Sequence, residues 1–460
     1  MRFLAERLRE VIRPGRPEGR PLRPADENAG DSSSGDDRVR NDDRIGDDDR
    51  SGRPSSGRPG HDAAETLGGQ WQENRGQRFL VIERKYAPGY RHGRTVVADA
   101  LPPADGMWPF LPLLAGTSCR GRLLFVDLET TGLAGGAGSY AFLVGCAWFD
   151  SAVFRVRQFF LSSFAGERGL LEAVAEVADS AGTLVTFNGK SFDMPLMETR
   201  YLLHRMETPF AGMPHVDMVH SARRLWRNDD DRLADAVRDS VPTRYADCRL
   251  STLEGVLCGH TREGDVPGFE IPSRYFHYVR SGNARALEQV MEHNRLDLLA
   301  LALVTAHASQ LLEEGPGAAR TAREALGMGR LYERAGLAAE ARAAFDRAAL
   351  MPAADPVTRA EALRAYAVLS RRQRRYEDAA VAWRRILDLR ACPPGISREA
   401  TEALAVHHEH RLRDPFAARS FALQSMTLPQ TPSRRDAVQH RLARLDRKLA
   451  GTSGDVIPLF

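Results

Sequence analysis

Two carboxylates at the end of one apolar strand constrain this chain more than any other feature. The segment LLFVDLETTGL (123–133) opens with four apolar residues, as expected of a strand buried on both faces, and then places Asp127 and Glu129 two positions apart. Side chains alternate along a strand, so both carboxylates lie on one face, with Cα atoms roughly 6.6 Å apart. Charges beside an apolar core need a partner, and a divalent cation is one. The alternative is that the two carboxylates cap the turn at 130–132. The motif alone does not decide between a metal site and a cap.

Three more titratable residues occur in two later segments. Asp193 follows a strand expected at 183–189 and begins the next expected helix, where the helix dipole favours a carboxylate. His293 and Asp297 lie four residues apart in a long helix expected at 286–312, and therefore on one face of it. Each has an ordinary structural explanation when taken alone. Together with the pair on the strand, they indicate a catalytic acidic site.

The four acids, on strand, strand, helix start and late helix, resemble those of the DEDD exonucleases, which have a ribonuclease H-like fold. Six ordered segments are similar, more closely, to the YprB-type ribonuclease H-like proteins, and six matches are far more specific than one. The segments are DLETTGLAGGAGSYAFLVG (127–145), TFNGKSFDMPLMETRY (186–201), HVDMVHSARRLW (215–226), CRLSTLEGVLCG (248–259), DVPGFEIPSRYFHYV (265–279) and HNRLDLLAL (293–301).

The resemblance implies a metal-dependent 3′–5′ exonuclease that holds two Mg²⁺ or Mn²⁺ ions about 3.5–4 Å apart. Hard cations of this kind take oxygen ligands, which suits carboxylates. In the implied arrangement Asp127 bridges both ions, Glu129 and Asp297 complete one ion site, and Asp193 acts largely through water. The expected substrate is nucleic acid, DNA or RNA, with a single-stranded 3′ end.

The resemblance also implies a general base and substrate contacts. His293 is the candidate base for the attacking water, and Thr130 and Asn188 are candidate contacts to the terminal nucleotide. For Asn188, a role as a turn former is equally compatible with the sequence. His293 precedes Asp297 by four positions, the spacing of the DEDD group that uses a tyrosine, whereas the histidine group leaves five, so the identity of the base stays open.

Two other functions fit the same residues. One is a nucleic-acid-binding scaffold whose ribonuclease H-like domain has little or no turnover, and the other is a structure-specific endonuclease. The complete set of four acids argues against the scaffold, because a scaffold has no need of all four.

Two neighbouring segments also carry polar residues that could belong to a site. His215 and Asp217 share one face of a strand expected at 214–219, but no cysteine or further histidine follows with zinc spacing, so a structural role is favoured. Asp265 and Tyr275 fall in a matching segment without a role that the sequence can assign.

Composition limits the setting in which the protein works. The formal net charge of +3 gives no broad attraction to nucleic acid, and no apolar run approaches the ~20 residues that span a bilayer. The first thirteen residues lack the apolar core of a signal peptide, and the five cysteines are scattered without a CxxC motif. A cytoplasmic protein with no membrane partner is expected.

The composition changes along the chain and divides it into five parts. The expected fold class is α/β, a ribonuclease H-like mixed five-stranded sheet flanked by helices, followed by an all-α repeat domain. The parts are a short amphipathic helix (1–13), a disordered linker (14–69), a small β-rich lead-in (70–119), the exonuclease domain (120–314) and the repeats (316–450). The lead-in is expected to contain strands at 78–86 and 94–101.

Small and aromatic residues recur at a fixed interval near the C-terminus. Ala341, Ala379 and Ala417 repeat every 38 residues, each followed four positions later by an aromatic side chain. This pattern resembles tetratricopeptide repeats, whose usual period is 34, and the four extra residues are expected in loops. The resemblance implies a short solenoid that binds a protein or peptide partner.

Overall fold

The protein is described here by a computed structural model. The predicted helix at 1–13, most of the predicted linker and residues 228–247 lie outside the residues that the structure describes. The described residues are 61–103, 107–132, 138–227, 248–429 and 431–452.

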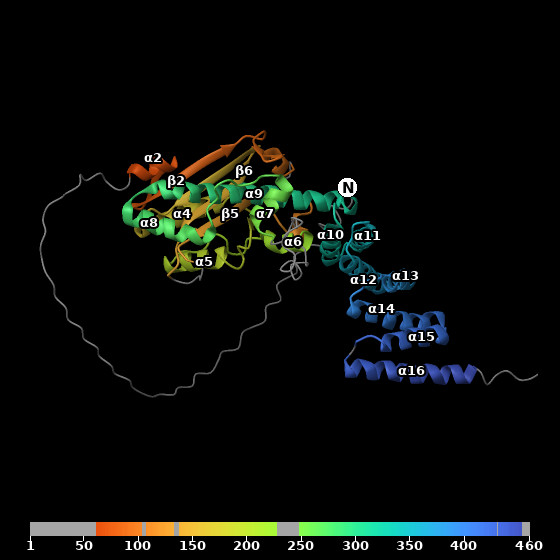
Figure 1. Ribbon diagram of the computed structural model, residues 1–460. Helices are drawn as coiled ribbons and strands as arrows, with labels where there is room; N and C mark the ends of the chain where they lie inside the picture. Colours follow the sequence, from red (N-terminus) through yellow and green to blue (C-terminus); the bar gives the residue numbers. More distant parts are fainter. Residues whose placement is uncertain (1–60, 104–106, 133–137, 228–247, 430, 453–460) are drawn as a thin grey trace, which may run out of the picture.

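A seven-stranded mixed sheet forms the centre of the first domain, in the order β1-β2-β7-β6-β5-β8-β9 (Figure 1). β5, β8 and β9 run parallel, and the remaining neighbours are antiparallel. The predicted α/β class and mixed sheet are therefore confirmed. The strands are β1 (Gln70–Asn74), β2 (Gln77–Tyr86), β5 (Leu123–Thr130), β6 (Ala141–Asp150), β7 (Val153–Phe160), β8 (Thr183–Thr186) and β9 (His215–Asp217).

Two of the seven strands come from the segment predicted as a separate lead-in. The five expected strands are β5 to β9, and β1 and β2 extend the same sheet beyond β7. β2 pairs with β7 from Leu80↔Phe160 to Tyr86↔Phe154, and its apolar residues Phe79 to Ile82 are buried. Residues 70–86 are thus part of the central sheet, in which β2 covers an edge that β7 would otherwise expose.

The prediction of a second strand in the lead-in, at 94–101, is wrong. Only Thr95–Val96 (β4) is extended, paired with Arg91–His92 (β3) in a separate hairpin. Val97–Ala100 then forms a 3-10 turn, in which the Asp99 carboxylate accepts a hydrogen bond from the Val96 amide at 2.8 Å. The short polar side chain therefore outcompetes the β propensity of the two valines.

Helices cover both faces of the sheet. One face carries the long helix α9 with α3 and α6, and the other carries α4, α5 and α8. Strand residues alternate between the two cores: Phe125 belongs to the α9 side, and Leu124 and Val126 to the opposite side. The helices are α3 (Leu111–Ala115), α4 (Glu167–Ala178), α5 (Asp193–Leu203), α6 (Met218–Leu225), α7 (Leu250–Leu253), α8 (Ile271–Ser281) and α9 (Glu288–Glu314).

The linker predicted at 14–69 ends earlier than its composition indicates. His61–Leu67 forms helix α2, and Ala63 and Leu67 are buried in the core on the α4 side. Two apolar residues at helical spacing are enough to fix this segment against the domain.

Among the described residues, one helix is long and apolar enough to cross a membrane. It spans Ala284–Glu314, and 78% of its most apolar stretch of 18 residues is buried inside the protein. Its leucines pack on the sheet and on the first repeat helices, which accounts for its apolar composition.

The C-terminal part consists of paired helices that lead away from the sheet (Figure 1). Its first helices share one core with α9, since Phe125, Leu299, Leu326 and Phe345 belong to one apolar cluster. The helices are α10 (Ala322–Arg334), α11 (Ala338–Leu350), α12 (Pro356–Arg372), α13 (Tyr376–Leu387), α14 (Pro394–His407), α15 (Pro415–Met426) and α16 (Pro432–Thr452).

The repeat period holds only for the first two pairs. Ala341 and Ala379 are buried at the predicted interval, but in the third pair the fully buried residue is Ala418, while Ala417 is only partly buried. The prediction that the four extra residues lie in loops is wrong. α12 has 17 residues against 13 in α10, so they add one turn to a helix.

Polar contacts fix the first repeat helix to the sheet domain. Trp226 donates to Glu324 at 2.8 Å, Tyr332 donates to the Leu312 carbonyl at 2.6 Å, and Arg334 donates to the Leu113 carbonyl at 2.8 Å. At the centre of the contact, Gly327 of α10 lies directly against the backbone of α6, where a Cβ atom would overlap the Arg224 carbonyl.

We therefore expect Gly327→Ala to destabilise the protein although alanine favours helix. The overlap should cost about 1–3 kcal/mol, against a gain of about 1 kcal/mol in helix propensity. Urea unfolding measures the difference, with Gly317→Ala as the control, because a Cβ atom at Gly317 meets nothing within 4 Å. Equal stability of the two variants would show that α10 does not pack on α6 at this point.

Candidate active site

The acidic pair lies where β5 extends beyond its parallel neighbour. β5 pairs with β8 only over Leu123↔Thr183 to Phe125↔Val185, so Asp127 and Glu129 stand past the end of that ladder. On the other side, Asp127 pairs with Gly145 of β6. The carboxyl ends of parallel strands in open α/β sheets are the usual place for a ligand site, because chain reversals there leave a crevice.

Helix α9 crosses this edge and contacts the acidic pair through Asn294. The buried Asn294 amide donates to the Asp127 carboxylate at 2.8 Å and to its carbonyl at 3.1 Å. Gln158 donates to the Asn294 oxygen at 2.9 Å, which leaves the Asn294 amino group to face Asp127. Glycine at 145 is needed for this approach, since a Cβ atom would overlap the Asn294 side chain.

His293 and Asp297 lie one turn apart on α9, as predicted, and face the acids of β5. The His293 Nε2 atom is 3.5 Å from Asp297 Oδ2 and 4.0 Å from Glu129 Oε1. Its other nitrogen, Nδ1, lies 2.6 Å from Asp265 Oδ1. Asp265 therefore holds the imidazole ring with Nε2 directed at the carboxylates.

A buried arginine joins the same group. Arg262 donates to Asp297 Oδ1 at 2.6 Å and to Asp265 Oδ2 at 3.4 Å, and its Nε atom donates to Glu254 Oε2 at 2.6 Å. Only 5% of the Arg262 side chain is exposed. One guanidinium therefore contacts three carboxylates from different segments of the chain.

Asp193 occupies the first turn of α5, as predicted, and Asp217 shapes the loop before it. The Asp217 carboxylate accepts hydrogen bonds from the amides of Asn188 at 2.6 Å and Lys190 at 3.0 Å, and it caps α6 through Val219. Asn188 has a left-handed backbone, with φ of 68°. These contacts give Asn188 the geometry of a turn former.

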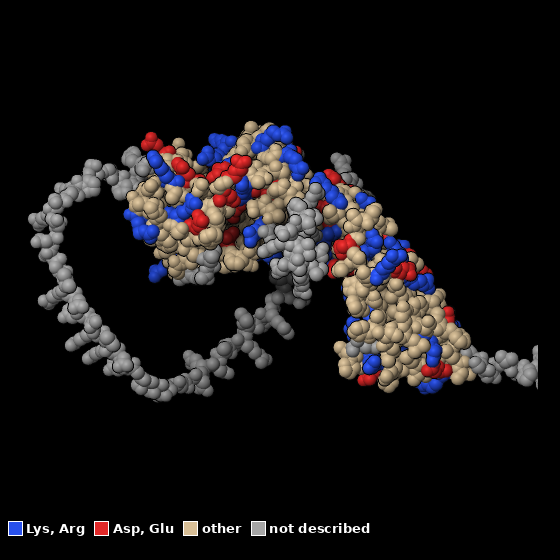
Figure 2. All heavy atoms as spheres, in the orientation of Figure 1, with Lys and Arg blue, Asp and Glu red and all other residues tan. Residues whose placement is uncertain are grey.

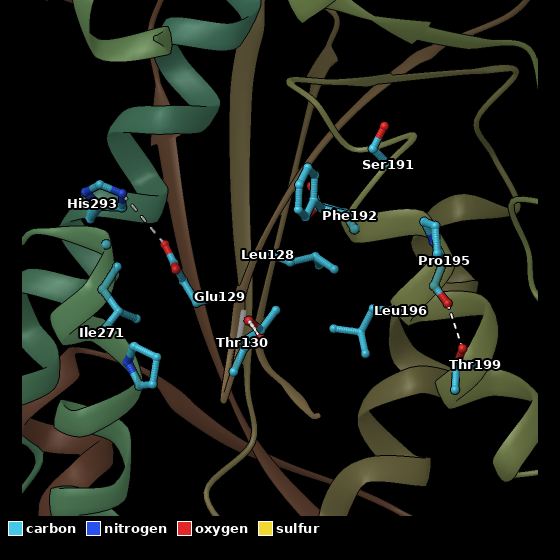
Figure 3. A pocket seen from close by; sticks show the side chains of 14 residues that line it. Leu128, Glu129, Thr130, Ser191, Phe192, Pro195, Leu196, Thr199, Ile271 and His293 are labelled. Carbon is cyan, nitrogen blue, oxygen red and sulfur yellow. Dashed lines mark hydrogen bonds and ion pairs between the residues drawn. The ribbon is translucent and has the colours of Figure 1, made fainter. Parts of the chain in front are cut away.

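An open pocket of about 420 Å³ lies between α5, α8 and β5. Figure 3 shows Glu129 and His293 on one side of it and Phe192, Pro195 and Leu196 on the other. Thr130 and Asp193 also line it, whereas Asn188 does not. In Figure 2 acidic side chains gather in a recess near the middle of this domain, with basic side chains around it.

Burial and mutual repulsion raise the pKa values of the gathered acids. Loss of water is the largest cause for Asp127 and Glu129, and Asp297 and Asp193 add to it, so the pKa of both carboxyls lies well above its usual range. Burial, with Asp217 and Asp297, raises the pKa of Asp193 to about 7. Burial alone would raise the pKa of Asp265, but hydrogen bonds from His293 and Arg262 outweigh it and lower the pKa.

These carboxylates fit a divalent cation. Each of Asp127, Glu129 and Asp193 is destabilised as an anion by its acidic neighbours, which a bound cation would reverse. The donor set consists of oxygen atoms, as Mg²⁺ and Mn²⁺ prefer. Arg262 occupies only one oxygen of Asp297 and leaves Oδ2 directed at the site.

A second cluster, of His92, Glu254 and His260, brings three possible metal-ligand atoms within 4.8 Å of one another. Both oxygens of Glu254 have hydrogen-bond partners: His92 Nε2 lies 2.5 Å from Oε1, and Arg262 Nε donates to Oε2 at 2.6 Å. The rings of His92 and His260 stack with centroids 4.1 Å apart. Both Glu254 oxygens are thus already engaged by protein groups.

Four residues support the site beyond the predicted ligands and base, and sequence reasoning missed two of them. Asp265 was noticed without a role, and Asp217 was assigned to structure, which its capping contacts support. Asn294 and Arg262 were not singled out. The detectable signal for Asn294 is a polar residue on the face of α9 that otherwise carries buried leucines, whereas Arg262 lies in a polar loop that gives no such contrast.

The mixed sheet with helices on both faces is consistent with a ribonuclease H-like fold. Residues 124–309 match the family model described as "RNase_H superfamily", whose members are typically nucleases that act on nucleic acid. Along most of its length the chain is also similar to the uncharacterized protein YprB of Bacillus subtilis (strain 168). The identity is 29% over 376 residues, which are 80% of this chain and 86% of the relative. The predicted resemblance to YprB-type proteins is confirmed.

The raised pKa of Asp193 predicts how stability depends on pH. A carboxyl whose folded pKa is about 7, against an ordinary 3.8, stabilises the fold fully below pH 3.8, and this contribution is lost as pH rises to about 7. We expect Asp193→Asn to melt at a higher temperature than the parent at pH 8 without metal, and to lose this advantage near pH 4.

Thermal melts with chelator at several pH values measure this effect. Added Mg²⁺ should stabilise the parent more than the variant at pH 8, because it offsets the repulsion among the acids. Equal melting temperatures of Asp193→Asn and the parent at pH 8 would contradict the mutual repulsion of the acids.

Proposed function

We propose that the protein is a metal-dependent 3′–5′ exonuclease. The observation that carries the proposal is the grouping of four acids beside His293. Glu129, Asp193 and Asp297 each raise the pKa of Asp127, and Glu129 and Asp193 line the pocket together with His293. The match to the ribonuclease H superfamily supports phosphodiester hydrolysis as the reaction class. The direction of degradation rests on the resemblance to DEDD exonucleases.

The same residues would hold the cations. Asp127, Glu129, Asp193 and Asp297 would hold them through their carboxylate oxygens. Bound Mg²⁺ or Mn²⁺ supplies stabilisation of the phosphate charge and acidification of a water molecule. Asn294 fixes the Asp127 carboxylate, so this ligand does not have to reorient when the site is loaded.

Proton transfer is assigned to His293. Its Nε2 atom faces the acidic edge and would accept a proton from the attacking water, while Asp265 holds Nδ1 at 2.6 Å. An aspartate on the second nitrogen fixes the ring orientation and stabilises the imidazolium that forms. The four-residue spacing from Asp297 thus still allows a histidine at this place to face the site.

The pocket supports binding of an unpaired strand end. Phe192 lines it and is 59% exposed, so its ring is available for stacking on a base. Thr130 lines the pocket as well, with its hydroxyl donating to the Gly132 carbonyl at 3.0 Å and able to accept from a substrate. Asn188 then acts by shaping the loop instead of by contacting the nucleotide.

The same proposal includes two further points. The paired helices from α10 onward are proposed to bind a protein or peptide, in line with their resemblance to tetratricopeptide repeats, and the cytoplasm is the proposed location.

We expect the protein to shorten 5′-labelled single-stranded DNA or RNA from the 3′ end with Mg²⁺ or Mn²⁺ and not with chelator. Asp127→Asn should lower the rate by about 100-fold or more, since it removes the shared ligand. Asp150→Asn, at an exposed acid on β6, is the matched control and should retain activity.

A circular single strand in the same assay tests the alternatives. Cleavage of the circle would identify an endonuclease. Binding of the linear strand by both the parent and Asp127→Asn, with neither shortening it, would favour the scaffold.

Phe192→Ala should weaken substrate binding selectively. Loss of one stacked base costs about 1–3 kcal/mol, so KM should rise roughly 5- to 100-fold with little change in kcat. Steady-state kinetics on a labelled oligonucleotide measure it, with Phe416→Ala as the control because Phe416 is 72% exposed on α15 in the repeats. An unchanged KM would remove Phe192 from the substrate path.

A further inference from the structure

Arg262 determines which group each carboxylate oxygen of Asp297 and Asp265 contacts. Asp297 gives Oδ1 to Arg262 and turns Oδ2 toward His293 Nε2, and Asp265 gives Oδ2 to Arg262 and Oδ1 to His293 Nδ1. One guanidinium therefore fixes the rotation of both carboxylates. Arginine can do this because its donors form a rigid planar fork, whereas lysine presents a single nitrogen.

Arg262 is itself anchored from the side away from the pocket. Glu254, which has no exposed surface, accepts from Arg262 Nε at 2.6 Å and lies 2.5 Å from the buried His92. His92 belongs to the β3–β4 hairpin, more than 160 residues earlier in the chain. A chain of buried polar contacts thus runs from this hairpin to the edge of the acidic site.

The hairpin is built to reach Glu254. The Arg94 amide donates to the Cys258 carbonyl at 2.6 Å, and the Arg94 side chain donates to the Val256 carbonyl at 3.1 Å. Gly93 has φ of 62°, and a Cβ atom there would overlap the Cys258 carbonyl. The segment that it contacts, Glu254–Cys258, is a π-helical turn, which is a common distortion at functional sites.

We propose that Arg262 is a positioning residue of the nuclease centre, held by Glu254 and His92, and that it sets the orientation of both Asp297 and the Asp265–His293 pair. This inference rests on the proposed function, because it assigns Asp297 to the metal and His293 to proton transfer. Arg262 acts through these groups and does not line the pocket itself.

The charges of the cluster support an orienting role. Removal of Arg262 would leave Glu254 and Asp297 without their cation in a region shielded from water, so these side chains would turn to other partners. Groups that orient metal ligands typically change metal affinity or activity by about 10- to 100-fold when they are lost.

The test uses the full chain with the variants Arg262→Lys and Glu254→Gln. Arg262→Lys keeps the charge without the fork, and Glu254→Gln alters the anchor without touching Asp297 or His293. The control is Arg155→Lys, at an arginine that also contacts two acids, Glu83 and Asp150, on the far part of the sheet. Mn²⁺ affinity is measured by titration calorimetry, kcat and KM with labelled oligonucleotide, and folding by thermal melts.

We expect Arg262→Lys to lower Mn²⁺ affinity and kcat by about 10-fold or more with KM within about 3-fold. Glu254→Gln should lower both in the same direction, and the double variant should fall no further than Arg262→Lys alone, because the two residues act in series. The Arg155→Lys control should match the parent in both quantities.

Several results would overturn the inference. One is a folded Arg262→Lys protein with parental Mn²⁺ affinity and kcat, and another is a double variant whose losses multiply. If Arg262→Lys does not fold, parental values for Glu254→Gln overturn it. If the parent binds Mn²⁺ but cleaves nothing, the proposed function fails, and the Mn²⁺ affinities of the variants still decide the role of Arg262. A parent that binds no Mn²⁺ overturns both proposals.

Discussion

The close approach of α9 to the sheet at Gly145 is the contact on which the site depends. Without a side chain at 145, Asn294 reaches the Asp127 carboxylate, and the next turn of the helix brings Asp297 to the same edge. The acids of β5 and α9 are separated by more than 160 residues in the chain, so only tertiary packing can gather them. The apolar burial along α9 supplies the free energy that offsets their repulsion.

The sheet strands next to the site and its acidic residues could be predicted from the sequence, and the reasons are physical. β5 carries an unbroken apolar run and then two charges, a pattern with few structural explanations, and His293 and Asp297 have the spacing of one helical turn. By contrast, the residues that hold these groups were not predictable. Arg262 is one of many arginines, and its role depends on its burial beside Glu254. No periodic pattern in the sequence predicts that burial.

The differences elsewhere also have local causes. The segment 94–101 has strand composition, but an aspartate at 99 captures the backbone and turns it. Residues 70–86 were predicted to belong to a small lead-in because composition does not reveal which sheet a strand joins. In the repeats, the interval between alanines was visible, but whether the added residues lengthen a loop or a helix depends on packing around α12.

The shared core of α9 and the first repeat helices has a mechanical consequence. The helix that carries His293 and Asp297 continues to Glu314, where Leu311 and Leu312 pack in the same cluster as Leu326 and Tyr332 of α10. The C-terminal helices are thus joined to the acidic site by one continuous helix, α9. If these helices bind a partner, as proposed above, α9 would hold that partner at a set distance and direction from the pocket, and the spacing would select how far a bound substrate can extend between the two ends of the protein.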